Sequence, residues 1–318
     1  MKNQFVKDLR EGDNVNDVFI AVRNDLRTKQ DGGKFLGMVF RDRSGEIGGI
    51  MWNNALEASR QFQVGDVVQV RGRVNLYQGR HQMVVEYLAP LMDGQYDIND
   101  LVYTPEHTQD DYQQLRAHLN TVQNPWLKQL LDAFLNDGKF VEEFLAAAAA
   151  KKWHHEYRGG LLRHCLEMME IAQPICNLFP EIDKDLLLAA IFLHDIGKLQ
   201  EMTHDLYSDY TTEGKLLGHI QIGSDITQEK ISAIDGFPPK LRMELLHCIL
   251  SHHGELAYGA SVVPKTLEAI VLHHIDNLDA QTAAFSRIIR ETRDRGQEWS
   301  EYMPLIERVI WTKGELNS

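Results

Sequence analysis

Two patterns of apolar and polar residues divide the chain. Between residues 15 and 89, apolar positions alternate with other positions in short runs, most clearly over residues 35–40 and 67–74. Alternation with a period of two is typical of half-buried β-strands. After residue 125, apolar positions recur at a spacing of three to four, which predicts helices. The sequence therefore predicts a small β domain followed by an all-α domain.

Turn residues separate the predicted strands. Residues 31–33, 43–45 and 78–79 contain the Gly, Asp, Ser and Gln side chains that tight turns accept, so about five strands are expected. Residues 53–60 begin with Asn and continue with helix formers, which predicts a short helix between the third and fourth strands. This arrangement is typical of an OB-fold β-barrel, and residues 35–52 and 64–74 resemble the OB domains that bind nucleic acids.

Charged and aromatic side chains near the predicted hairpins are candidates for contacting nucleic acid. The loops of OB-folds commonly hold strands through cations and stacked rings. The predicted contacts are Arg23, Arg27 and Lys34 around the first long hairpin, Trp52 after the third strand, and Arg73, Tyr77 and Arg80 around the last hairpin. Two alternatives stay open, because charged hairpins are often only solvated and aromatic residues of small barrels often lie in the core.

The apolar spacing also sets the expected helices and domain limits. Helices are expected over residues 126–134, 141–152, 161–179, 185–193, 240–252 and 265–290. We expect a barrel over residues 1–92, a linker with leading helices over 93–150, a helical domain over 151–295 and a tail over 296–318. The tail carries Trp299, Tyr302 and Trp311, which are expected to contact the helical domain or a second copy in a homo-oligomer.

Charge is distributed unevenly between the two halves. The chain of 318 residues has a net charge of −13, but residues 1–90 carry 13 Lys and Arg against 11 Asp and Glu. The remainder carries 33 − 13 = 20 basic against 46 − 11 = 35 acidic residues. An acidic surface repels phosphodiesters unless bound cations offset it. The barrel can therefore bind a polyanion directly, whereas the helical half needs bound metal ions before it can bind one.

Histidine is concentrated in the helical half. Eleven of the fourteen histidines fall between His154 and His274. The side chains suited to a metal come in a fixed order: His164, the pair His194 and Asp195, His219, the pair His252 and His253, and Asp276. Imidazole and carboxylate together suit Mn²⁺, Fe²⁺ or Mg²⁺, whereas structural zinc normally recruits thiolates. The three cysteines, Cys165, Cys176 and Cys248, lack the spacing of a zinc site and are expected to be reduced, buried thiols.

This ordered series resembles the HD superfamily of metal-dependent phosphohydrolases over residues 150–290. The resemblance implies that His164, His194, Asp195 and Asp276 hold a first divalent ion, and that Asp195 bridges to a second ion held by His219, His252 and His253. Two such ions can clamp the attacking and leaving oxygens of a phosphoester. Lys198 is expected either to assist catalysis beside Asp195 or to be a solvated lysine at a helix end.

Three further histidines have open roles. His154 and His155 are expected to line a substrate cleft or to lie on a loop. His273 precedes Asp276 by about one helical turn, so it is expected either to orient that carboxylate or to pack on its helix.

The combination of an OB-fold with an HD domain, together with residues 154–161, resembles the YhaM family of bacterial 3′-to-5′ exoribonucleases. That resemblance implies a barrel that presents single-stranded RNA, or DNA, to an HD domain that cleaves from the 3′ end. It also implies Mn²⁺ as the effective ion, with Mg²⁺ or Fe²⁺ as alternatives.

Two other functions stay open. One is hydrolysis of a small nucleotide, such as a cyclic dinucleotide, a deoxynucleotide triphosphate or an alarmone. The cyclic-dinucleotide version is weakened because no Gly-Tyr-Pro signature follows the His-Asp pair. The other is nucleic-acid binding with an inactive HD domain, which the intact His194, Asp195 and Asp276 disfavour.

The sequence also sets an expectation for location. No apolar run approaches the roughly 20 residues that a membrane span needs, and residues 1–10 have no apolar segment of a signal peptide. We therefore expect a cytoplasmic protein with no membrane partner.

Overall fold

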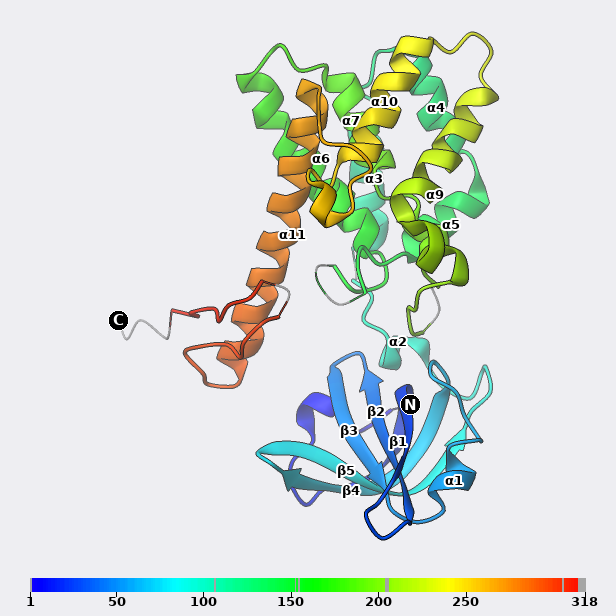
Figure 1. Ribbon diagram of the computed structural model, residues 1–318, viewed down its shortest axis with the longest axis vertical. Coiled ribbons are helices and arrows are strands. Elements are labelled where there is room, and N and C mark those ends of the chain that lie inside the picture. The colour runs from blue at the N-terminus through cyan, green and yellow to red at the C-terminus, as the bar shows by residue number, and fades with distance from the viewer. Residues whose placement is uncertain are drawn as a thin grey trace. The chain divides into compact units, whose positions relative to one another are not determined.

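The computed structural model in Figure 1 contains two compact units. It describes residues 2–105, 107–151, 153, 155–203, 206–304 and 306–313. The first unit comprises Met1–Pro105 and Thr203–Asp209, and the second comprises Glu106–Met202 and Tyr210–Ser318. The short segment Thr203–Asp209 thus folds with the first unit although it interrupts the second in sequence.

The first unit is a closed five-stranded barrel (Figure 1). Its strands are β1 (Asn14–Thr28), β2 (Lys34–Asp42), β3 (Gly45–Met51), β4 (Val67–Tyr77) and β5 (Arg80–Pro90), in the order β1-β2-β3-β5-β4. All neighbouring strands are antiparallel except β3 and β5, which are parallel. The helices of this unit are η1 (Val6–Asp8), α1 (Ala55–Ala58), between β3 and β4, and α2 (Ile98–Leu101). The prediction of a five-stranded OB-fold with a helix at this point is confirmed.

Alternation along the strands divides the barrel into an inner and an outer face. On β2, Leu36, Met38 and Phe40 are buried in the barrel core, while the residues between them are partly exposed. Gly72 allows β4 and β5 to approach at a shift in their register. A Cβ atom there would lie 2.4 Å from the carbonyl oxygen of Val84, so no other residue fits without moving the backbone.

The segment Thr203–Asp209 completes a small apolar cluster on this unit. Ile20, Val67 and Leu101 form the buried part of the cluster, and Leu206 and Tyr207 pack against it. The guanidinium of Arg41 lies 5.6 Å from the centre of the Tyr207 ring.

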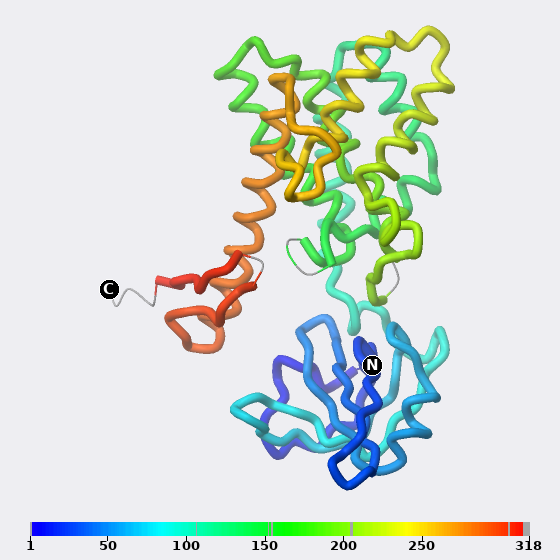
Figure 2. Tube along the Cα trace, in the orientation of Figure 1, coloured from blue at the N-terminus to red at the C-terminus, as the bar shows by residue number. Residues whose placement is uncertain are grey.

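The second unit is helical, as the apolar spacing predicts (Figures 1 and 2). Its helices are α3 (Thr108–Leu119), α4 (Pro125–Leu135), α5 (Gly138–Ala146), α6 (Gly160–Leu178), α7 (Lys184–Leu193), α8 (Lys198–Glu201), α9 (Thr212–Ser232), α10 (Pro239–Ser251), η2 (Leu256–Tyr258) and α11 (Leu267–Asp294). Side chains of Asp183, Thr211 and Thr266 cap the first turns of α7, α9 and α11. All residues of α7 from Leu186 to Leu193 are buried, so this helix forms the centre of the core.

Two helical segments differ from the prediction. The helix expected over residues 141–152 ends at Ala146, because the next residues are extended and buried. The carbonyl of Ala147 accepts a hydrogen bond from the amide of Leu161, and the amide of Ala149 donates to the carbonyl of His155. Tertiary contacts here outweigh the high helix propensity of alanine.

Helix α9 was not predicted, because glycines interrupt its apolar spacing. Gly218 has φ 73° and ψ 155° and kinks the helix directly before His219. Gly214 lies against α8, and a Cβ atom there would come within 2.2 Å of the carbonyl oxygen of Glu201. The glycines that hide the helix from sequence analysis are therefore needed for the kink and for close packing.

The tail beyond α11 forms a short hairpin. Trp299 pairs with Trp311 and Met303 with Arg308 in isolated antiparallel bridges, and both indole rings are about half exposed. Cys165 and Cys248 are buried thiols as expected, whereas Cys176 is partly exposed. Within the described ranges, no helix is both long and apolar enough to span a membrane.

Candidate metal centre

The structure brings together all seven residues predicted as metal ligands, within the helical unit. They are His164 in α6, His194 and Asp195 after α7, His219 in α9, His252 and His253 after α10, and Asp276 in α11. Asp195 lies in the middle. Its Oδ2 atom is 3.2 Å from Nε2 of His194 and 3.9 Å from Nε2 of His164. Its Oδ1 atom is 3.5 Å from Nε2 of His219 and 3.6 Å from Nε2 of His252.

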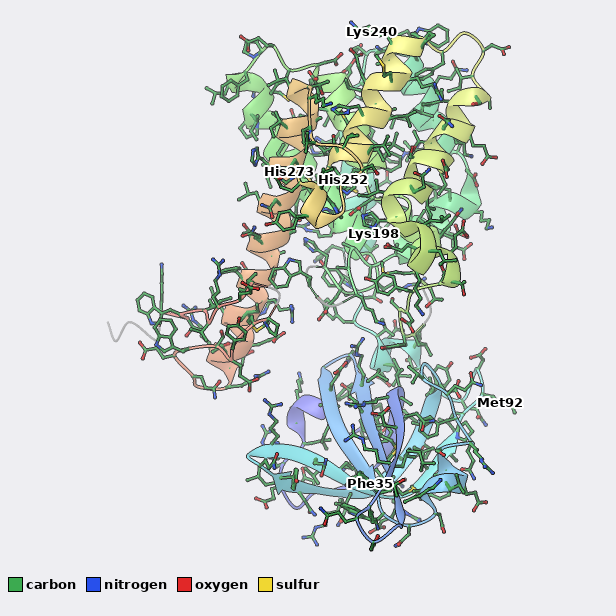
Figure 3. All side chains as sticks on the ribbon, viewed as in Figure 1. Phe35, Met92, Lys198, Lys240, His252 and His273 are labelled. Atoms are coloured by element: carbon green, nitrogen blue, oxygen red, sulfur yellow. The ribbon has the colours of Figure 1, made fainter. Side chains whose placement is uncertain are left out.

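Overlapping groups of these side chains have the spacing of a metal site. Donor atoms lie within 4.8 Å of one another in the groups His164–His194–Asp276, His194–Asp195–His252 and His219–His252–His253. The first and second groups share His194, and the second and third share His252. Asp276 thus lies at one edge of the centre and His253 at the other. Figure 3 shows His252 and Lys198 inside the helical unit, with Lys240 at the far end of α10.

Backbone carbonyls fix the orientation of three of the imidazole rings. Nδ1 of His194 donates to the carbonyl of Ile191 at 2.8 Å, and Nδ1 of His252 donates to that of Ile249 at 2.7 Å. Both histidines follow the last residue of a helix and use the carbonyl three residues before them. Nδ1 of His253 donates to the carbonyl of Tyr258 at 2.7 Å. A carbonyl only accepts, so each Nδ1 carries the proton and each Nε2 is left with a lone pair that can bind a metal ion.

Two carboxylates orient the other rings, and neither was predicted. Nδ1 of His164 donates to Oδ2 of Asp279 at 2.6 Å, and Nδ1 of His219 donates to Oε1 of Glu201 at 3.0 Å. The backbone amide of His219 donates to the same Glu201 oxygen at 3.0 Å. Asp279 follows Asp276 by three residues on α11, a spacing that places both on one helix face. That spacing was the available signal, since acidic residues are common in this half.

Buried lone-pair atoms without a hydrogen-bond partner show that the group fits a divalent cation. Among the described residues, His194 Nε2, Asp195 Oδ1 and His252 Nε2 are buried without a hydrogen-bond partner. Nε2 of His219 lies 3.3 Å from Nε2 of His253, although both rings hold their proton on Nδ1. Facing lone pairs and an unpaired carboxylate oxygen are costly in a protein interior. A cation with nitrogen and oxygen ligands removes that cost, and this donor set suits Mn²⁺, Fe²⁺ or Mg²⁺.

The surroundings of the centre favour the ligand forms of Asp195 and His252. Burial alone would raise the pKa of Asp195, but Lys198, and then His194, hold that pKa well below its usual range. Burial holds the pKa of His252 well below its usual range, so its imidazole is neutral. Burial opposes charge on His164 as well, but hydrogen bonds with Asp276 and Asp279 raise its pKa to about 9. Without an ion, His164 thus shares a proton with Asp276, whose Oδ1 is 3.2 Å from Nε2.

Lys198 is buried at this centre and is not a solvated lysine at a helix end. Its Nζ donates to Oδ2 of Asp195 at 2.5 Å. Gly197, directly before it, lies so close to α9 that a Cβ atom would come within 1.9 Å of the carbonyl oxygen of His219. Only glycine allows this approach, which holds Asp195 and His219 in one site.

A cavity of about 380 Å³ lies beside Asp279, the carboxylate that orients His164. Its lining includes His155, Glu167 and Asp279, and Nε2 of His155 is 3.1 Å from Oδ2 of Asp279. His155 therefore lies in the hydrogen-bond network that supports His164, whereas His154 falls outside the described residues. His273 donates from Nδ1 to the carbonyl of His252 at 2.8 Å, so it supports that backbone rather than Asp276.

The barrel distributes the predicted nucleic-acid contacts over its outer surface. Trp52 is 45% exposed, its ring lies 5.3 Å from the ring of Phe35, and Lys29 Nζ lies 4.9 Å above it. Arg27 is opposite Phe35 in the β1–β2 register and so adjoins this aromatic pair. The remaining predicted contacts lie on the strands or at their ends: Arg23 on β1, Lys34 at the start of β2, Arg73 and Tyr77 on β4, and Arg80 at the start of β5.

Not all of these cations are equally available. Arg23 and Arg27 both pair with Asp25, which neutralises part of their charge. Trp52, which is exposed and lies beside Phe35 and Lys29, is thus the best candidate contact for a strand of nucleic acid.

A buried cluster of imidazoles and carboxylates in a helical unit, on one chain with a closed five-stranded barrel, suits the class of metal-dependent hydrolases that carry a nucleic-acid-binding domain. Comparison with known families agrees with this class. Residues 161–281 match the family described as HD domain, and residues 20–91 match the family described as OB-fold nucleic acid binding domain. All seven candidate ligands lie inside the HD match. The HD domain indicates a metal-dependent phosphohydrolase.

Solved structures share similarity with parts of the chain. The second OB-fold domain of replication protein A from Methanococcus maripaludis is 19% identical with a TM-score of 0.25, over 30% of this chain and 99% of that one. A replication protein A heterotrimer bound to single-stranded DNA is 16% identical with a TM-score of 0.22, over 37% of this chain and 81% of that one. Asparaginyl-tRNA synthetase from Pyrococcus horikoshii is 16% identical with a TM-score of 0.24, over 43% of this chain and 36% of that one.

Proposed function

We propose that the protein is a metal-dependent exonuclease that hydrolyses phosphodiester bonds from the 3′ end of single-stranded RNA, with DNA as a second substrate. The observation that carries this proposal is the convergence of unprotonated imidazole Nε2 atoms on the buried carboxylate of Asp195. The adjoining barrel, which matches a nucleic-acid-binding family, supports a polymer as the substrate.

We assign the candidate ligands to two sets that share Asp195. One ion would be held by His164, His194, Asp195 and Asp276, and a second by Asp195, His219, His252 and His253. When bound, such ions supply Lewis acidity that polarises phosphoryl oxygens and makes water a better nucleophile. The ions also offset the acidity of this half of the chain, which would otherwise repel the substrate.

The protein's own contribution is to hold these groups in place. Lys198 keeps Asp195 ionised and adds a positive charge where the phosphate would be bound. Glu201 and Asp279 fix the rings of His219 and His164, so that little reorganisation is needed during the reaction. We therefore assign Asp195 and Lys198 as the catalytic residues.

The barrel would bind the strand before cleavage. Trp52 offers a ring for stacking, and Arg27, Lys34, Arg73 and Arg80 offer cations for the phosphates. Tyr77 is exposed at the end of β4 and offers a second ring. Stacking and phosphate contacts tolerate any base sequence, so this surface suits an enzyme that degrades unrelated strands.

The first test is a gel assay on 5′-labelled single-stranded RNA and DNA with Mn²⁺, with Mg²⁺ and with chelator. We expect a metal-dependent ladder that shortens from the 3′ end, while a covalently circular strand of the same sequence stays intact. The Asp195→Asn variant should lose metal binding and several orders of magnitude in rate while keeping its circular dichroism spectrum.

Other outcomes would replace the proposal. Cleavage of the circular strand would indicate an endonuclease. Intact strands combined with hydrolysis of a small nucleotide would indicate a nucleotide phosphohydrolase. If neither is hydrolysed although strands are bound, the protein is a binding protein. Normal turnover by folded Asp195→Asn would contradict the assignment of the centre.

A further inference from the structure

Two chain segments meet at one edge of the metal centre, where Nε2 of His219 lies 3.3 Å from Nε2 of His253. Leu216 and Leu217 lie just before His219, at the start of α9. Leu256 and Tyr258 lie just after His253, in η2. We call these four residues the apolar rim.

The apolar rim is exposed. Leu216 is 78% and Tyr258 71% exposed, and Leu217 and Leu256 are also exposed. Single exposed apolar residues are common, but here two exposed pairs come from the two segments whose histidines meet at the metal centre, which makes the rim a candidate binding surface. The position of the group beside the phosphate-binding centre indicates which part of a substrate would cover it.

The backbone holds Tyr258 in a fixed position beside His253. Gly254 and Gly259 adopt positive φ angles of 78° and 93°, which close a tight turn. Within the turn, the amide of Tyr258 donates to the carbonyl of Glu255 at 3.0 Å. The carbonyl of Tyr258 accepts the Nδ1 proton of His253 at 2.7 Å. The same residue therefore orients a candidate ligand through its backbone and leaves its ring in solvent.

We propose that the apolar rim, with Tyr258 as its aromatic member, stacks on the base of the nucleotide whose phosphodiester bond lies at the metal centre. Tyr258 is then a specificity-determining residue that distinguishes nucleotide esters from other phosphate esters. This inference rests on the proposed function, because it takes a nucleotide as the substrate. A base has an apolar face and no charge, so it needs a surface of this kind next to the cations that bind its phosphate.

The separation of backbone and side chain at Tyr258 gives a clean test. Tyr258→Ala keeps the carbonyl that orients His253 and removes only the ring, whereas Tyr258→Phe keeps the ring and serves as the conservative variant. Tyr302→Ala, at an exposed tyrosine of the tail, is the matched control. Each variant is compared with the wild type on two oligonucleotides of one sequence, one with a normal 3′-terminal nucleotide and one with an abasic 3′-terminal residue.

Loss of one stacked base should lower kcat/KM of Tyr258→Ala about 5- to 150-fold on the normal strand. On the abasic strand, Tyr258→Ala and the wild type should have the same kcat/KM. Tyr258→Phe and Tyr302→Ala should resemble the wild type on both strands. An equal loss on both strands would show that Tyr258 acts only through His253, and no loss on either would show that its ring is not used. Both results overturn the inference.

A binding measurement separates this inference from the proposed function. The fluorescence of 2-aminopurine ribonucleoside 5′-monophosphate, measured with Ca²⁺, should be quenched by the wild type and by Tyr258→Phe but not by Tyr258→Ala. Quenching without any cleavage of oligonucleotides would retain the rim as a base site while the exonuclease proposal fails. Cleavage without quenching would retain the exonuclease and overturn the rim.

Discussion

Asp279 offers a test of how the centre is supported, because it lies outside the set of candidate ligands. Its Oδ2 atom accepts hydrogen bonds from Nδ1 of His164 at 2.6 Å and from Nε2 of His155 at 3.1 Å. Asp279→Asn preserves size and one oxygen acceptor but removes the charge. The His164 ring is then held by a neutral hydrogen bond in place of a charge-assisted one.

The magnitude follows from these contacts. A hydrogen bond to a charged group contributes roughly 1.5–3 kcal/mol, and a neutral one about 1 kcal/mol. Asp279→Asn replaces the charged hydrogen bond at His164 by a neutral one and causes a smaller loss at His155. Together these changes remove about 1–3 kcal/mol of the free energy that holds the His164 ring in place. Loss of such an outer partner typically lowers metal affinity about 10- to 100-fold, which is ~1.4–2.7 kcal/mol and agrees with this sum.

The assay is a titration with Mn²⁺ in which electron paramagnetic resonance reports the free ion. Asp294→Asn, at an exposed carboxylate on the same helix, is the control and should bind like the wild type. Thermal melting followed by circular dichroism establishes that both variants are folded. Wild-type affinity in folded Asp279→Asn would refute the view that this carboxylate positions a metal ligand.

Two further predictions concern other parts of the molecule. Trp52→Ala should weaken binding of single-stranded RNA by ~1–3 kcal/mol, measured by fluorescence anisotropy. Trp311→Ala, at a similarly exposed indole, should leave binding unchanged. Equal losses in the two variants would exclude Trp52 as a specific contact. At Asp137, the hydrogen bond from Lys230 lowers the carboxyl pKa, so this group stabilises the fold above its unfolded pKa, and the contribution is lost as the pH falls through the lower folded pKa. Asp137→Asn should therefore unfold at lower urea than the wild type at pH 7 but not at a pH below both pKa values; a difference that persists there would assign the effect to capping of α5 instead.

The sequence predicts much of the fold because its patterns are regular. Alternation over residues 35–40 and 67–74 reports the inner and outer faces of the barrel. The run of apolar residues before His194 reports a fully buried helix that ends at the centre. The ordered series of histidines and aspartates could be read without coordinates because each ligand type is scarce in an ordinary helical core, and the structure brings all of them together.

Other features could not be read because their causes are tertiary. Helix α9 lacks apolar periodicity, since its glycines serve a kink and close packing against α8. Ala147 is extended, and its carbonyl bonds with the amide of Leu161, a contact that helix propensity does not predict. Glu201 and Asp279 are distinguished from the other acidic residues only by burial against an imidazole ring.

The assignment of Thr203–Asp209 to the barrel unit has a consequence for how the chain is made. The backbone passes between the units three times, after Pro105, after Met202 and after Asp209. A ribosome releases the barrel strands early, yet Leu206 and Tyr207, which cover the cluster around Leu101, emerge only after α3 to α8 have been synthesised. A fragment that ends at Pro105 would lack these two of the apolar contacts that the cluster has in the whole chain.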